Sequence, residues 1–194
     1  MLIIVLMSAE KKERVILGID PGTAVMGYGV VCEKGSKPAL ESLGIVKLDH
    51  LEDHFLKLKL IFEKTVSLID AYQPDVLAIE APFYGKNIQV LLKLGRAQGI
   101  AMAAALSRSI PVFEYAPRKI KQSITGNGNA TKEQVAAMLQ RLLNFKETPE
   151  FLDATDGLAV ALCHAFQRNP ASSGTGKSYS GWAGFVKDNK SRLR

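Results

Sequence analysis

The sequence predicts an α/β fold in which helices flank one five-stranded mixed sheet. Three strand-like segments, residues 15–20, 27–32 and 40–48, are joined by short connections, which is typical of an antiparallel meander. Beyond them, two further strand-like segments alternate with helical ones, and this alternation predicts parallel strands. In such a sheet, functional groups gather outside the carboxyl ends of the parallel strands.

The first helix is indicated by apolar residues that recur at helical spacing after the meander. These residues are Leu51, Phe55, Leu58, Phe62 and Ile69. The sequence QPD at residues 73–75 ends this helix and leads into a fourth strand at residues 76–80.

A second, long apolar helix is predicted at residues 87–107. It carries Gly95, Gly99 and several alanines. Side chains this small let another backbone approach closely, and that backbone belongs either to a neighbouring helix or to a second subunit. A fifth strand follows at residues 111–115.

Three more helices complete the predicted order. Pro117 suits the first turn of one helix. The sequence TKEQ at residues 131–134 is a capping box that opens the next, which runs to about Asn144. The last helix begins near Asp153 and extends past His164.

Length and composition favour a single globular domain. The chain has 194 residues, of which 47% are hydrophobic, and no apolar run approaches the roughly 18 residues that a membrane span needs. The apolar opening, residues 1–7, is short and lacks the pattern of a signal peptide. Cys32 and Cys163 show no metal-ligand spacing, so we expect reduced core thiols in a cytoplasmic protein.

The chain divides into three expected parts: an N-terminal extension at residues 1–13, a folded domain at residues 14–169 and a Ser/Gly-rich tail at residues 170–194. Most of the net charge of +6 lies in the last 27 residues, which hold six basic residues and one acid. A basic tail is weak support for nucleic-acid binding. Trp182 and Phe185 within it suit either docking on DNA or a partner, or a segment without fixed structure.

Four carboxylates occupy positions that suggest metal chemistry. Asp20 and Glu80 each end an apolar strand, and Asp153 and Asp156 stand three apart at the start of the last helix. Each has a plainer explanation, because aspartate favours turns and acids favour helix N-termini. Together they are better explained as oxygen ligands for hard divalent cations, since buried unpaired charge is heavily penalised.

The spacing of the two aspartates places them on one helical face, with Cβ atoms about 5–6 Å apart. Two Mg²⁺ ions would offset the repulsion among four carboxylates and a phosphodiester. A pair of ions can also activate water and stabilise a leaving oxygen. Without metal, we expect the cluster to raise its own pKa values and to destabilise the fold.

Five motifs together resemble the RuvC family of Holliday junction resolvases, the crossover junction endodeoxyribonucleases. They are IDPGT at 19–23, IE at 79–80 with Phe83 three residues on, LGRAQG at 94–99, YAPRKIK at 115–121 and DATDGLAVA at 153–161. They follow the family order from about residue 14 to residue 169.

The resemblance implies a ribonuclease-H-like fold and a homodimer that resolves four-way DNA junctions in recombination and repair. Paired, symmetric hydrolysis would leave 5′-phosphate and 3′-hydroxyl ends and would need two Mg²⁺ ions per subunit, with Mn²⁺ as a possible substitute. The branch-migration proteins RuvA and RuvB are the implied partners.

The resemblance also assigns roles to individual residues. It implies that the metal-binding catalytic acids are Asp20, Glu80, Asp153 and Asp156, and that the DNA-binding residues are Phe83, Lys121 and Lys132. From the residues alone, Phe83 would suit core packing and the two lysines a solvated surface.

Two features near the acids have simpler roles. His164 lies two helical turns, about 12 Å, beyond Asp156 along the helix, so we expect a core or supporting histidine rather than a ligand of the same metal. Gly157 stands where the family usually has alanine, which would weaken the helix by roughly 1 kcal/mol.

Two other functions fit parts of the pattern. The Asp20–Gly22 turn also suits the phosphate loop of sugar kinases and actin-like ATPases, although that leaves the other three acids without a shared purpose. A junction-binding module without catalysis is a third class, and the presence of all four acids speaks against it.

Overall fold

The computed structural model describes residues 13–35, 37–82, 87–145 and 152–167. Its elements follow the predicted order and are β1 (Arg14–Asp20), β2 (Val25–Lys34), β3 (Lys37–Lys47), α1 (His54–Tyr72), β4 (Val76–Glu80), α2 (Ile88–Ser107), β5 (Val112–Tyr115), α3 (Pro117–Thr125), α4 (Lys132–Leu143) and α5 (Leu152–Gln167). The predictions for residues 1–12, Phe83, Trp182 and Phe185 concern residues outside the described ranges.

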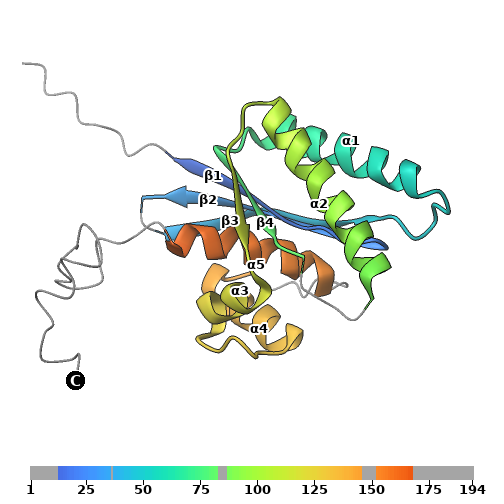
Figure 1. Ribbon diagram of the computed structural model, residues 1–194. Helices are drawn as coiled ribbons and strands as arrows, with labels where there is room; N and C mark the ends of the chain where they lie inside the picture. The colour runs from blue at the N-terminus through green and yellow to red at the C-terminus, as the bar shows by residue number, and fades with distance from the viewer. Residues whose placement is uncertain (1–12, 36, 83–86, 146–151, 168–194) are drawn as a thin grey trace, which may run out of the picture.

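The five strands form one mixed sheet in the order β3-β2-β1-β4-β5. The first three strands pair antiparallel, as the meander predicts, and β1, β4 and β5 run parallel. Helices α1 and α2 cover one face, while α5, with α3 and α4 beyond it, covers the other (Figure 1). The predicted α/β architecture is therefore confirmed.

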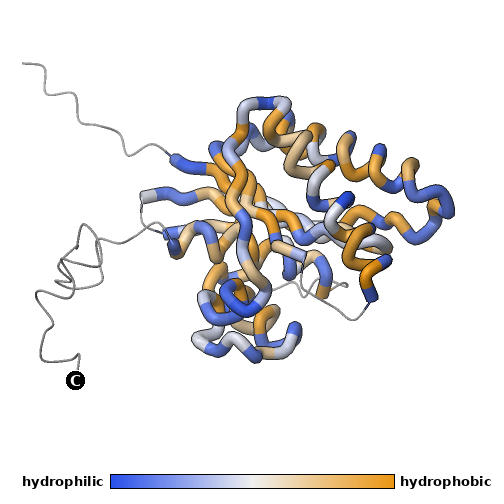
Figure 2. Tube along the Cα trace, in the orientation of Figure 1, coloured by the Kyte–Doolittle hydropathy of each residue, from blue (hydrophilic) through white to orange (hydrophobic). Residues whose placement is uncertain are grey.

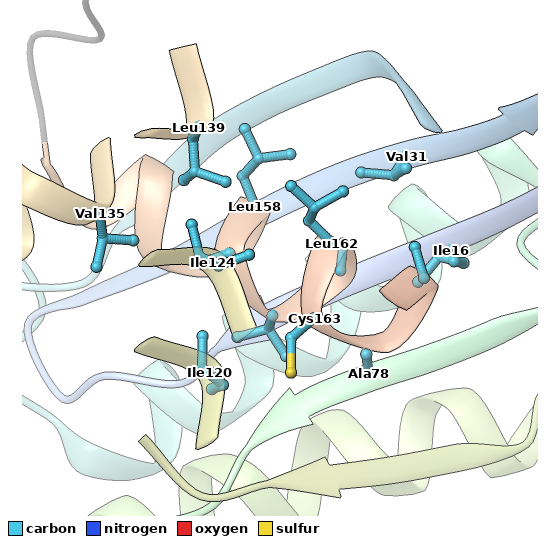
Figure 3. Close-up of a cluster of buried hydrophobic side chains, with 14 of the residues drawn as sticks. Ile16, Val31, Ala78, Ile120, Ile124, Val135, Leu139, Leu158, Leu162 and Cys163 are labelled. Carbon is cyan, nitrogen blue, oxygen red and sulfur yellow. The ribbon is translucent and has the colours of Figure 1, made fainter. Parts of the chain in front are cut away.

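Side chains of the central strands alternate between two cores. Ile16 and Ala78 pack on the α5 face, where they meet Leu158 and Leu162 (Figure 3). Ile19 and its neighbours on the same side pack against α1 and α2. Figure 2 shows the resulting hydrophobic colour along the strands in the middle of the molecule.

Helix α5 packs directly on β1 and β2 because glycines allow the backbones to touch. A Cβ atom added to Gly157 would lie 2.5 Å from Tyr28 Cα, too close for any real contact. A Cβ atom added to Gly27 would overlap the carbonyl group of Asp153. Gly157 thus has a packing role that helix propensity does not reveal, and the first turn of α5 is fixed against β2.

The helix boundaries follow their capping residues. Thr131 and Gln134 form the expected capping box of α4, and Pro117 begins α3. Helix α1 starts at His54, after the cap Asp53, so Leu51 lies outside it. Phe55 is 75% exposed, which shows that the helical spacing identified the helix more reliably than its buried face.

The expectations for cysteine and histidine are also met. Cys32 and Cys163 are free and buried. His164 is buried, with Nδ1 2.7 Å from the Tyr115 hydroxyl and Nε2 2.6 Å from an Arg14 guanidinium nitrogen. It is a core histidine. Within the described ranges, no helix is long and apolar enough to cross a membrane.

Candidate active site

Asp20 and Glu80 end neighbouring parallel strands. Ile19 of β1 pairs with Ile79 of β4, so the two acids that follow come next to each other at the same edge of the sheet. Because Ile19 and Ile79 face α1 and α2, the next side chain on each strand points to the face that α5 covers. A cavity of about 260 Å³ opens beside them and is also lined by Leu94 of α2.

The first turn of α5 brings two more acids to this place. Asp20 pairs with Gly27 across β1 and β2, and the main chain of Asp153 lies directly over Gly27. Asp156 is one turn further along the same helix. The side chain of Asp156 is 16% exposed and that of Asp153 is 43% exposed, so the pair runs from the interior to the surface.

Lys132 joins the two aspartates. Its Nζ lies 3.1 Å from Asp153 Oδ1 and 2.6 Å from Asp156 Oδ2. The shared contact confirms that both aspartates lie on one helical face. The capping box at Thr131 sets the position of Lys132, because it fixes the first turn of α4. An ammonium group therefore lies among the acids, where a surface lysine was the simpler expectation.

The pKa values of the acids respond to this crowding. Burial raises the pKa of Asp20 to about 6, and the negative charges of Asp156 and Asp153 act in the same direction. The positive charge of Lys132 opposes this rise. Burial and the charges of Asp20 and Asp156 raise the pKa of Glu80 to about 8. Burial also raises the pKa of Asp156, although Lys132 opposes the rise. The expected upward shift is confirmed for these three acids.

The charges around Lys132 act on its own ionisation. Partial burial by itself would lower the pKa of Lys132, but hydrogen bonds and charge from Asp156 and Asp153 outweigh it and raise that pKa. Lys132 is therefore an ammonium ion at any ordinary pH. Lys121 of α3 also faces the cluster, since its charge lowers the pKa values of Glu80 and Asp156.

The donor set fits a hard divalent cation in its chemistry. All four acids offer carboxylate oxygens, the ligands that Mg²⁺ and Mn²⁺ prefer. Across the described part of the chain, no three His, Cys, Asp or Glu side chains are already gathered closely enough to hold an ion. Four carboxylates without a cation repel one another, so a closed ligand set requires side-chain movement.

One residue that supports the site was missed in the sequence. Gln98 of α2 is buried, and its side-chain amide nitrogen donates to the main-chain oxygen of Glu80 at 3.3 Å and to Glu114 Oε2 at 2.9 Å. Its position within the LGRAQG motif was the available signal, but the motif alone gave it no partner.

The amino-acid sequence is similar to those of known proteins over most of its length. The family model described as "Crossover junction endodeoxyribonuclease RuvC" matches residues 16–164. Proteins with that description from Christiangramia forsetii and Bacteroides fragilis are each 57% identical to this chain. The first match covers 96% of both chains, and the second covers 94% of this chain and 97% of its relative.

Solved structures of junction-resolving enzymes have the same fold as this chain. Thermus thermophilus RuvC in complex with Holliday junction substrate is 35% identical, with a TM-score of 0.73 over 79% of this chain and 94% of that one. The yeast mitochondrial Holliday junction resolvase Ydc2 is 16% identical, with a TM-score of 0.56 over 77% of this chain and 78% of that one, and supports the fold alone. These neighbours bear out the expected ribonuclease-H-like fold.

Proposed function

Because this chain belongs to the RuvC family of crossover junction endodeoxyribonucleases, we propose that Asp20, Glu80, Asp153 and Asp156 are the catalytic metal ligands of a Holliday junction resolvase. The chain is a nuclease that resolves Holliday junctions, and its family is metal-dependent. The observation that carries the residue assignment is the convergence of acids from β1, β4 and α5 around the ammonium of Lys132.

The acids have the features that metal-assisted hydrolysis needs. Bound among them, two Mg²⁺ ions would supply Lewis acidity that activates water and stabilises the leaving 3′ oxygen. Glu80 and Asp20 come from the rigid sheet edge and set the inner part of the site. Asp153 and Asp156 come from a helix fixed by glycine contacts, so their distance from the strands is constant.

Lys132 has a second role once a cation neutralises the aspartates. Its ammonium group is then released to contact the phosphate backbone, which lysine binds as a point charge. Lys121 lies on the same side of the site and suits the same role. Phe83 is assigned to stacking on an unpaired base at the junction centre, a contact worth about 1–3 kcal/mol.

A homodimer is proposed because two symmetric cuts need two sites. Its interface is proposed on the outer side of α2, where Ile88 and Leu92 are 63% and 51% exposed. A Cβ atom added to Gly95 or Gly99 would meet open space within the subunit, whereas Ala101 is fully buried against the core. Ala97, Ala101, Ala104 and Ala105 thus serve internal packing, and the glycines are available to a second subunit.

The biological setting is proposed from the family. RuvA and RuvB, which drive branch migration, are the proposed partners that deliver junctions to this enzyme in recombination and repair. A pull-down with purified RuvA and RuvB on junction DNA tests this, and we expect both proteins to be retained with the wild-type chain.

The direct experiment offers the protein a synthetic mobile four-way junction and a linear duplex of matched sequence, with and without Mg²⁺. We expect paired, religatable nicks in the junction alone, only with Mg²⁺, and none from Glu80→Gln. Junction binding without cuts, across several junction sequences and with Mn²⁺ as well, would instead indicate a binding module. Cutting by Glu80→Gln at the wild-type rate would contradict the residue assignment.

A further inference from the structure

We infer that Gln98 is a positioning residue that sets the main chain of Glu80 and thereby the metal affinity of the site. The inference deepens the proposed function and rests on it, because it takes Glu80 to be a metal ligand. Gln98 touches neither substrate nor reacting atoms, so any effect it has acts through Glu80.

The contact is specific and buried. Gln98 is 7% exposed, and its single amide nitrogen donates both to the main-chain oxygen of Glu80 and to Glu114 Oε2. A buried amide that lost both acceptors would be left unsatisfied, which makes the pair of contacts costly to break. The carboxylate of Glu114 is the stronger acceptor, and it holds the amide in the orientation that reaches Glu80.

Three elements meet at this contact. Glu80 ends β4, Glu114 lies in β5 opposite Ile79, and Gln98 lies in α2. The next residue is also fixed, since Ala81 N–H donates to the Tyr115 carbonyl at 2.9 Å. The chain around Glu80 is therefore held from β5 on one side and from α2 on the other.

This arrangement matters because Glu80 is the last residue of its strand. A shift of the strand end would move the carboxylate relative to Asp20 and the α5 acids. Groups that orient metal ligands typically change metal affinity or activity by about 10–100-fold when they are removed.

The same contact connects the site to the outer surface of α2. Gln98 faces inward to Glu80, while the adjacent Gly99 is exposed on the side proposed for the second subunit. A displacement of α2 would reach Glu80 through Gln98. Gln98 thus lies between that proposed surface and the proposed metal site.

The test measures metal binding without relying on cleavage. Full-length wild type and Gln98→Met are titrated with Mg²⁺ by isothermal titration calorimetry at one fixed temperature, and the Mg²⁺ concentration that half-saturates the protein is recorded. Gln98→Met keeps the side-chain length but removes the donor. We expect the half-saturating Mg²⁺ concentration to rise by about tenfold, with binding of junction DNA in EDTA unchanged.

Three further variants separate positioning from general loss of stability. Gln73→Met removes an exposed amide that also donates to two acceptors, both main-chain oxygens at the end of α1, and should leave the half-saturating Mg²⁺ concentration unchanged. Glu114→Ala leaves Gln98 packed but removes its anchor, and should give an intermediate rise even if Gln98→Met folds poorly. Glu114→Gln, which retains an acceptor, should restore wild-type behaviour.

The inference is overturned if Gln98→Met and Glu114→Ala lower Tm while the half-saturating Mg²⁺ concentration stays at the wild-type value. That pattern would mark Gln98 as a purely structural residue. Glu80→Gln serves as the reference for the site itself. If it binds Mg²⁺ as the wild type does, the proposed metal site fails, and the role of Gln98 fails with it for that separate reason.

Discussion

The ammonium nitrogen of Lys132 lies 2.6 Å from Asp156 Oδ2 and 3.1 Å from Asp153 Oδ1, so one lysine joins the two acids of α5. Hydrogen bonds that involve a charged group are about twice as strong as neutral ones. Lys132 supplies positive charge beside the same aspartates that the proposed divalent cations would neutralise. Its effect on stability should therefore depend on metal.

Replacing Lys132 tests this relationship. In EDTA, Lys132→Met should lower the free energy of unfolding by about 1 kcal/mol, because ion pairs made by a half-exposed lysine contribute on that order. Saturating Mg²⁺ should reduce the loss, since the cation neutralises Asp153 and Asp156. Urea unfolding of both proteins in both conditions measures it.

A matched control for that variant is Lys59→Met, which removes an exposed pair with Glu63 on α1. Its small effect should be the same with and without Mg²⁺. An equal loss for Lys132→Met in the two conditions would show that Lys132 does not compete with metal.

The raised pKa values predict how stability depends on pH without metal. The pKa of Glu80 is about 8 in the folded protein and near 4.5 when unfolded, so the folded state holds the proton more tightly. This contribution to stability is present in full below the unfolded value and is lost as pH rises toward about 8. Asp20 acts in the same direction up to about pH 6.

Unfolding free energies measured in EDTA between about pH 5 and about pH 8 should therefore fall with rising pH. In Glu80→Gln the unfolding free energy should fall less over the same pH range. Saturating Mg²⁺ should reverse the trend for the wild type, because the ion binds ionised carboxylates and releases their protons. Identical pH profiles for wild type and Glu80→Gln would contradict the assignment of the raised pKa to Glu80.

Two arguments predict opposite effects of Gly157→Ala on stability. Helix propensity alone predicts that the free energy of unfolding rises by about 1 kcal/mol. The contact with Tyr28 predicts a loss, of about 1–3 kcal/mol, because the added methyl group would collide with main-chain atoms that cannot move independently. We expect Gly157→Ala to lose stability, which would be measured as a lower midpoint of denaturant unfolding.

Ser67→Ala, at an exposed position in α1, provides the control, because it changes helix propensity without adding a main-chain contact. It should be neutral or stabilising by up to about 1 kcal/mol. A stabilised Gly157→Ala would mean that α5 does not approach β2 as closely as described.

Gly99→Leu tests the proposed dimer surface. The subunit has room for the larger side chain, so the far-ultraviolet circular dichroism should be unchanged, while the close approach of a second subunit should be blocked. Analytical ultracentrifugation should show a dimer for wild type and a monomer for Gly99→Leu. Ala137→Leu, at an exposed position on α4, should remain dimeric. An intact Gly99→Leu dimer would place the interface elsewhere.

Local patterns in the sequence predict the elements well. Strand ends at Asp20 and Glu80 are marked by the change from apolar to acidic residues, and the capping box at Thr131 marks the start of α4. The i, i+3 spacing of Asp153 and Asp156 needs nothing beyond helical geometry. These features depend on neighbours along the chain.

Contacts between distant segments could not be predicted in the same way. Gln98 gains its role from Glu80 and Glu114, which lie on two different strands. The contacts of Lys132 with the aspartates form because α4 packs beside α5. The exposure of Phe55 depends on which face of α1 packs against the sheet. Each of these three features depends on distances between residues far apart in the chain, and the spacing of residues in the sequence does not give those distances.

The most direct test of the central claim is anomalous diffraction from crystals of the protein soaked in Mn²⁺. The account predicts two anomalous peaks among the carboxylates of Asp20, Glu80, Asp153 and Asp156, with the ammonium of Lys132 moved away from the aspartates. Peaks at another place, or an empty carboxylate cluster with Lys132 still bound to Asp156, would contradict the claim that these acids form the metal site.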